Sequence, residues 1–155
     1  MNPKAKLIAL VGAGVVALVV PCVSYYEGTI LRTYLDPVGI PTACTGHTGP
    51  DVKAGQVYTP EQCDNILATD LYKHDAEIQR CIHVPLTDGQ HAAFLSFAFN
   101  VGASKFCKST LNRKLNAGDY PGACAELSKW VYAGGRVLPG LVKRRAAERK
   151  LCEGT

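Results

Sequence analysis

The chain opens with an unbroken apolar stretch, LIALVGAGVVALVV, which runs from Leu7 to Val20 and follows Lys4 and Lys6. Basic residues before an apolar segment are typical of an export signal or a membrane anchor. The stretch is shorter than the roughly 20 apolar residues of a stable span, and it ends in VVPC, without the small residues of a cleavage site. We therefore expect residues 1–23 to form an uncleaved, weakly held signal anchor. A cleaved signal peptide and a buried core helix are the alternatives.

The two lysines also predict the orientation of such an anchor. Positive charge stays on the cytoplasmic side, so residues 24–155 are expected to form a catalytic domain in the periplasm. The seven cysteines agree with this compartment, because dispersed cysteines in a small chain indicate disulfides. No CxxC pattern supports a zinc or redox site. An odd number of cysteines leaves at least one thiol outside a disulfide within the chain.

The pattern changes after the apolar stretch. Residues 23–31 can form a short helix carrying Glu27, and Arg32 to Tyr58 is rich in Gly, Pro and Thr with short β-prone runs, which predicts a small irregular sheet. Two segments, TPEQ from Thr59 and TDGQ from Thr87, have the capping-box pattern of a helix start. The first predicted helix runs toward residue 80. The second contains AAFLSFAFNV, is apolar nearly all round, and is expected to be the centre of the core.

Shorter helices are predicted over residues 109–116, 120–130 and 140–152, with Trp130 in the core. The expected fold class is α+β, with a small β-rich lobe, a larger helical lobe and a cleft between them. The basic run KRR at residues 143–145, with Arg149 and Lys150 after it, is expected to be a solvated helix face with ion pairs between helices. A net charge of +4 without a basic stripe excludes a typical nucleic-acid binder and suits an anionic wall or phospholipid surface.

Glu27, Asp36 and Thr42 form the constellation with the clearest chemistry. Hydrolysis of a glycosidic bond needs a proton donor and a carboxylate that attacks or activates water. A helix end, a hairpin turn and a neighbouring strand can face one another across a cleft and give two carboxyls different pKa values. Taken singly, each of these residues is more often an ordinary surface or turn residue.

From about Tyr25 to Leu151 the sequence resembles the phage-type lysozymes of glycoside hydrolase family 24. The Glu–Asp–Thr triad of that family falls on Glu27, Asp36 and Thr42 without a gap, and its glycine–histidine element appears within TGHTG. The segment VPLTDGQHAAFLSFAFNVG resembles the long central helix of the family. STLNRKLNAGDYPGA and LPGLVKRRAAERKLC match its closing helices in order.

The resemblance implies a lysozyme that cleaves the β-1,4 linkage between N-acetylmuramic acid and N-acetylglucosamine in peptidoglycan strands, as a monomer without cofactor or metal. Glu27 would be the general acid, Asp36 the nucleophile or base, and Thr42 would hold the water. Substrate contacts would come from Gly46, His47, Phe99 and Asn100. A structural role is the stronger interpretation for His47, and Phe99 fits the core as well as a cleft wall.

Together with the apolar N-terminus, the resemblance points to a signal-anchor-release endolysin. Such an enzyme is tethered to the host inner membrane in an inactive form and is freed into the periplasm to cause lysis. For a member of this family we expect three disulfides and leave Cys22 as a free thiol at the membrane edge; the expected pairs are Cys44–Cys63, Cys81–Cys107 and Cys124–Cys152. A free Cys22 could exchange with a disulfide on release, although a spare thiol without a regulatory role fits equally well.

Three other functions remain open. A wall-binding protein could keep the fold without catalysis, and a chitinase or lytic transglycosylase could share it. A disulfide-stapled inhibitor would have no need of the triad. Whether the enzyme inverts or retains configuration depends on the separation of the two carboxyls.

Overall fold

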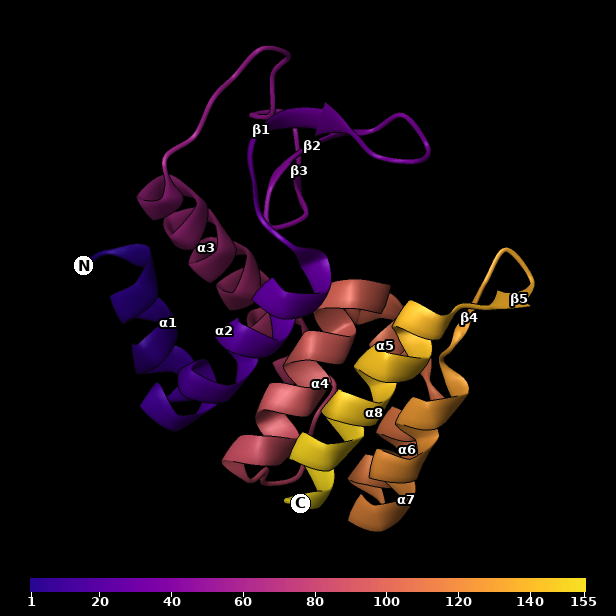
Figure 1. The fold of residues 1–155 in the computed structure, drawn as a ribbon. Coiled ribbons are helices and arrows are strands. Elements are labelled where there is room, and N and C mark those ends of the chain that lie inside the picture. The colour runs from indigo at the N-terminus through magenta and orange to yellow at the C-terminus, as the bar shows by residue number, and fades with distance from the viewer.

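A small antiparallel sheet is set apart from a larger group of helices (Figure 1), in a computed structural model that describes all 155 residues. The sheet has the order β1-β2-β3, and a separate two-stranded hairpin, β4–β5, lies before the last helix. The strands are β1 (Ile30–Leu35), β2 (Pro41–Cys44), β3 (His47–Thr48), β4 (Tyr132–Ala133) and β5 (Arg136–Val137). The helices are α1 (Pro3–Val11), α2 (Ala13–Glu27), α3 (Pro60–Gln79), α4 (Asp88–Val101), α5 (Ala103–Lys108), α6 (Thr110–Asn116), α7 (Tyr120–Glu126), the short 3₁₀ helix η1 (Leu127–Lys129) and α8 (Pro139–Glu153). The expected α+β class is confirmed.

The two predicted capping boxes are confirmed at the starts of α3 and α4. At α3, the Thr59 hydroxyl accepts the backbone N–H of Gln62, whose side chain in turn accepts the N–H of Thr59. Thr87 and Gln90 make the same reciprocal pair at α4. These bonds satisfy N–H groups that have no partner within a helix, so the local sequence alone determines where both helices begin.

The α4 helix lies at the centre of the core, as its sequence predicts. Every residue from Ala92 to Ala98 is buried, and α4 packs mainly against α2 and α8. Trp130 packs edge-on against Phe97 at a centroid distance of 5.1 Å and is half-buried at the border of this core. The α3 helix contacts α1 and α4 and also touches strands β2 and β3, so it connects the two parts of the fold (Figure 1).

Several boundaries differ from the predictions. The helix expected over residues 23–31 is wrong at its end, because α2 stops at Glu27 and the chain is already in β1 at Ile30. The helix expected over residues 120–130 ends at Glu126 and continues only as η1. Neither α5 nor the β4–β5 hairpin is among the predicted elements.

The N-terminal stretch forms two helices rather than one. The axes of α1 and α2 meet at a bend of 118°, and neither helix alone has the length and apolarity to cross a membrane, whereas the pair taken together passes that test. Gly12 sits at the bend with φ +91°, a conformation that few other residues tolerate. Both helices pack on the protein, and their buried side chains are Leu7, Val11, Val15, Val16, Val19 and Val23. In this structure the segment is therefore part of the core. This corresponds to the buried core helix, the alternative that Lys4 and Lys6 disfavour.

Three disulfides join elements that are distant in sequence. Cys44–Cys63 links β2 to α3, Cys81–Cys107 links the end of α3 to α5, and Cys124–Cys152 links α7 to α8. These are the three expected pairs, and Cys22 is the free thiol. The cluster beneath the small sheet has only five buried residues, two of them Cys44 and Cys63. Because so small a core gives little stability, that disulfide supplies a large share of it, roughly 2–4 kcal/mol.

Candidate active site

Glu27 is the last residue of α2, and two neighbours hold its carboxyl. Oε1 accepts a hydrogen bond from Arg144 Nη1 on α8 at 2.6 Å, and the side chain is 23% exposed. Oε2 lies against Gly46 in the turn between β2 and β3, where an added Cβ would come within 3.0 Å of it. Gly46 also has φ +72°. The expected Gly46 therefore lets the turn approach the carboxyl closely, a specific reason for glycine at this position.

Asp36 follows β1 directly and is fixed by the turn that it begins. Its Oδ1 accepts the backbone N–H groups of Val38 at 2.9 Å and Ile40 at 2.8 Å, the pattern of an Asx turn. Because both bonds go to Oδ1, Oδ2 takes no hydrogen bond from the protein. The carboxyl is thus held at one oxygen and keeps the other for a substrate or a water.

Thr42 lies in the middle of the sheet and is 4% exposed. It pairs with Tyr34 of β1 on one side and Thr48 of β3 on the other. Its hydroxyl donates to the backbone carbonyl of Ile40 at 2.9 Å, so its lone pairs remain available to accept a hydrogen bond. The N–H of Ile40 binds Asp36 and its carbonyl binds Thr42, and one peptide segment therefore orients both side chains.

Tyr34 shows that the two carboxyls share one neighbourhood. Burial raises the pKa of Tyr34, and the charges of Glu27 and Asp36 raise it further. Tyr34 pairs with Thr42 in the sheet, and the Glu27 carboxyl lies against Gly46 in the β2–β3 turn, so Glu27, Asp36 and Thr42 all lie at the small sheet.

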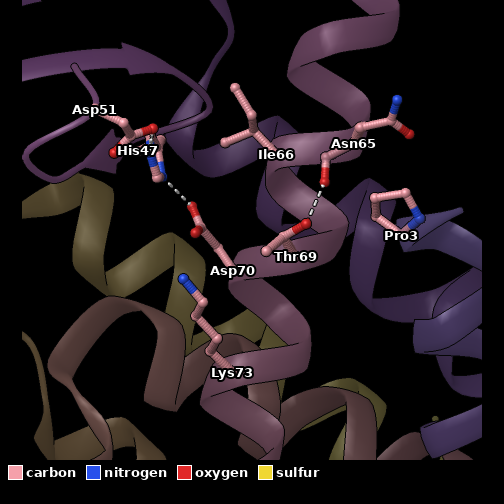
Figure 2. A pocket seen from close by; sticks show the side chains of 8 residues that line it. All are labelled: Pro3, His47, Asp51, Asn65, Ile66, Thr69, Asp70 and Lys73. Atoms are coloured by element: carbon pink, nitrogen blue, oxygen red, sulfur yellow. Dashed lines mark hydrogen bonds and ion pairs between the residues drawn. The ribbon is translucent and has the colours of Figure 1, made fainter. Parts of the chain in front are cut away.

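His47 sits at the junction of the small sheet with α3, where a pocket of about 250 Å³ opens (Figure 2). Its Nδ1 lies 2.7 Å from Asp70 on α3, and its Nε2 lies 2.9 Å from Asp51 in the loop after β3. Both ring nitrogens of His47 are therefore paired with carboxylates. These two contacts support a structural role, in which His47 connects the small sheet to α3. None of Glu27, Asp36 and Thr42 lines this pocket; its residues are Pro3, His47, Asp51, Asn65, Ile66, Thr69, Asp70 and Lys73.

Replacing His47 by asparagine should make stability less dependent on pH. Burial alone would lower the pKa of His47, but the hydrogen bonds to Asp51 and Asp70 outweigh it and raise the pKa above the ordinary 6.5. The stability that the ion pairs of His47 contribute is thus complete below about pH 6.5, and it disappears as pH rises through the pKa of His47 in the folded state. On the acid side, the hydrogen bond from His47 lowers the pKa of Asp51 below the ordinary 3.8, so the contribution fades as pH falls below that value.

Thermal unfolding of the wild type and His47→Asn across pH 3–9 checks this. We expect the variant to be less stable by about 1 kcal/mol between roughly pH 4 and 6.5, with the difference closing at alkaline pH. His83→Asn is the matched control, because that side chain is exposed and its ring makes no ion pair. A difference of constant size across the whole range would contradict the ion-pair role.

The remaining expected substrate residues lie at the end of α4. Phe99 is half-buried, packs on the core and lies 5.2 Å from the ring of His74. Asn100 is exposed, and its Oδ1 accepts a hydrogen bond from Arg145 Nη2. No group of three or more His, Cys, Asp or Glu side chains has the arrangement of a metal site.

The basic run is only partly the solvated face that the sequence predicts, because Lys143 and Lys150 are exposed but Arg144 and Arg145 are not. Arg144 is 3% exposed and Arg145 is 1% exposed, and Glu148 beside them is fully buried. The expected ion pair between helices does exist, as Arg144 with Glu27. Arg144 thus contacts Glu27 but is not among the site residues expected from the sequence. The sequence does contain an indication of this burial. Arg144 and Glu148 have opposite charges and lie four positions apart on one face of a helix that packs on the core.

Comparison with known proteins identifies the family. A family model described as phage lysozyme matches residues 24–148, most of the chain. The chain belongs to the phage lysozyme family. As a member of that family it is a lysozyme-type glycosidase with the lysozyme fold.

Two curated relatives and one solved structure show how far the similarity extends. The chain is 44% identical to a SAR-endolysin of Bacteriophage PS119 over 126 residues, which covers 81% of this chain and 75% of the relative. It is 37% identical to a SAR-endolysin of Bacteriophage PS34 over 160 residues, which covers 98% of this chain and 96% of the relative. A variant of P22 lysozyme has a similar structure, with a TM-score of 0.77, 35% identity and coverage of 89% of this chain and 93% of that one.

Proposed function

We propose that this chain is an endolysin that hydrolyses the β-1,4 linkage between N-acetylmuramic acid and N-acetylglucosamine and so lyses the host cell. The observation that carries the proposal is that the Glu27 carboxyl lies against Gly46 in the turn of the same small sheet in which Ile40 joins Asp36 to Thr42. The names of the relatives support the lytic role, since both are endolysins.

The three side chains differ in the way that the reaction requires. Glu27, whose side chain is 23% exposed, would protonate the leaving oxygen of the glycosidic bond. Asp36, with one oxygen fixed by backbone N–H groups and the other free, would act on the opposite side of the sugar as nucleophile or base. Thr42 would accept a hydrogen bond from the attacking water, because its own proton is already given to Ile40.

Product analysis tests the reaction class. Purified protein incubated with peptidoglycan should release muropeptides with reducing muramic acid ends, identified by mass spectrometry before and after borohydride reduction. Anhydromuramyl ends would identify a lytic transglycosylase instead. Binding to the wall without any product would identify a wall-binding protein that has lost catalysis.

We further propose that residues 1–23 anchor the chain in the host inner membrane, with residues 24–155 in the periplasm, until release. The α2 helix ends in Glu27 and buries four valines, Val15, Val16, Val19 and Val23, in the core. The same side chains cannot lie in lipid and in the core at once, so Glu27 would be out of place while the segment is in the bilayer. Gly12, Gly14 and several alanines lower the apolar area that holds the segment in the membrane.

Fractionation of expressing cells tests the tether. Before depolarisation the uncleaved chain should sediment with membranes, and after an uncoupler is added it should move to the soluble periplasmic fraction, together with the onset of lysis. A chain that is soluble from the beginning, or one shortened by a signal peptidase, would contradict the anchor.

A further inference from the structure

Three charged side chains are buried together where α2, α4 and α8 meet. Arg144, Arg145 and Glu148 are 3%, 1% and 0% exposed. Removing charges from water costs several kcal/mol per ion, and apolar residues of the same size often give a more stable core. A buried cluster of this kind therefore needs an explanation other than stability.

The contacts of Arg145 are structural. Its guanidinium donates to Glu148 Oε1 at 2.5 Å, to the backbone carbonyl of Trp130 at 2.9 Å and to Asn100, and it lies over the ring of Phe97. These partners come from α4, α8 and the segment after η1. Arg145 thus holds the closing helix against the core, and it consumes one oxygen of Glu148 in doing so.

Arg144 faces the other way, toward the site. It donates to Glu27 Oε1 at 2.6 Å and to the backbone carbonyl of Ser96 at 3.2 Å. Its Nε lies 3.7 Å from Glu148 Oε2, and neither of these two buried atoms has a hydrogen-bond partner. The carboxylate of Glu148 therefore lies between the two guanidiniums, one oxygen toward each.

We propose that Glu148 is a positioning residue for the general acid, acting through Arg144. The inference rests on the proposed role of Glu27. With Glu148 ionised, two guanidiniums face two carboxylates, so Arg144 can hold the Glu27 carboxyl in place while its positive charge is largely compensated. Without that compensation, the field of both guanidiniums falls on Glu27 and favours its ionised form, which cannot donate a proton.

The other groups that face the cluster do not supply this charge. From α2, Cys22 and Tyr26 approach it, and burial raises the pKa of both, so they are neutral at neutral pH. The α4 helix contributes Ser96 and Asn100, which do not titrate. Burial also raises the pKa of Glu148 itself, opposed by Arg145 and Arg144. Its ionised form is favoured by its place between the two guanidiniums, with Oε1 2.5 Å from Arg145 and Oε2 3.7 Å from Arg144.

The test is the pH profile of kcat/KM on soluble, uncross-linked glycan strands at constant ionic strength. Glu148→Gln should move the alkaline limb of the profile to lower pH by about one unit, with KM little changed. Arg144→Gln should move the limb in the opposite direction and lower kcat. The double variant Arg145→Gln with Glu148→Gln removes one charge of each sign, and it should return the limb toward the wild-type position. A purely structural role would not produce opposite shifts.

Glu153→Gln is the matched control, because Glu153 forms an exposed pair with Arg149 on the same helix. Its profile should coincide with that of the wild type. A folded Glu148→Gln enzyme with an unmoved limb would overturn the inference. If Glu148→Gln does not fold, Arg144→Gln becomes the deciding variant, and its limb must move to higher pH for the inference to stand. Glu27→Gln distinguishes failure of the proposed function from failure of the positioning role. If Glu27→Gln stays active, the proposed function fails. If Glu27→Gln is inactive but Glu148→Gln and Arg144→Gln keep the wild-type profile, only the positioning role fails.

Discussion

Glu27→Gln should abolish peptidoglycan hydrolysis, with a loss of about 10³-fold or more, while the protein stays folded. Glutamine has the size of glutamate, and its side-chain oxygen can still accept the hydrogen bond from Arg144 that Oε1 accepts at 2.6 Å. The variant therefore keeps the geometry and loses only the proton that the leaving oxygen needs. The measurement is the initial rate of reducing-end release from peptidoglycan, with near-ultraviolet circular dichroism as the check of folding.

Glu61→Gln supplies the comparison, because Glu61 is an exposed residue in the first turn of α3. Its rate should equal that of the wild type. If Glu27→Gln kept a tenth or more of the activity, Glu27 would not be the general acid, and another side chain near Tyr34 would have to take that role. Binding of the inactive variant to peptidoglycan should persist, which distinguishes lost chemistry from lost recognition.

The sequence predicts best where short-range chemistry decides the structure. The Thr59 and Thr87 capping boxes and the apolar run of α4 involve residues within a few helical turns, and all three are confirmed. The triad is proposed from the resemblance to phage-type lysozymes, and its members lie within sixteen consecutive residues: Glu27 in α2, Asp36 in the turn after β1 and Thr42 in β2. No long-range packing is needed to bring such neighbours together.

The failures involve contacts that are distant in sequence. The solvated face predicted for Arg144 follows from the usual exposure of charged residues, yet this arginine is separated from Glu27 by more than a hundred residues, and that partner decides its burial. The β4–β5 hairpin is a different kind of miss. Its turn is Gly134-Gly135, both with positive φ, and Gly-Gly between short β-prone pairs is a known hairpin signal. This local signal is present in the sequence and could have predicted the hairpin.

The N-terminal segment shows why one sequence can satisfy two environments. An apolar stretch is equally suited to lipid and to a protein core, so hydropathy alone does not choose between them. The break at Gly12 and the burial of Val19 and Val23 belong to the packed state. The lysines at positions 4 and 6 match the requirements of export. The sequence pattern therefore fits a segment that occupies first one environment and then the other.

Val19→Asp should inactivate the purified enzyme. Val19 is fully buried between α2 and the rest of the core, and an unpaired carboxylate there costs about 3 kcal/mol or more. No disulfide holds α1 or α2, so we expect these two helices to detach while the disulfide-linked remainder stays folded. Because Glu27 ends α2, detachment removes it from Arg144 and from the β2–β3 turn. Limited proteolysis should then cut within the first 27 residues, and the rate of hydrolysis should fall with it.

Leu18→Asp separates this effect from any effect on the membrane. Leu18 is the preceding residue and is 36% exposed, so the same carboxylate reaches water in the packed state. Both positions lie near the end of the apolar stretch, so either substitution weakens the hold of the bilayer by less than the roughly 2.5–3.5 kcal/mol of a charge at the centre of a span. Both variants should leave the membrane more readily than the wild type, but only Leu18→Asp should lyse cells early, because only it can complete the fold. Equal activity of the two purified proteins would show that the N-terminal helices take no part in the active structure, and the account of activation by release would then fail.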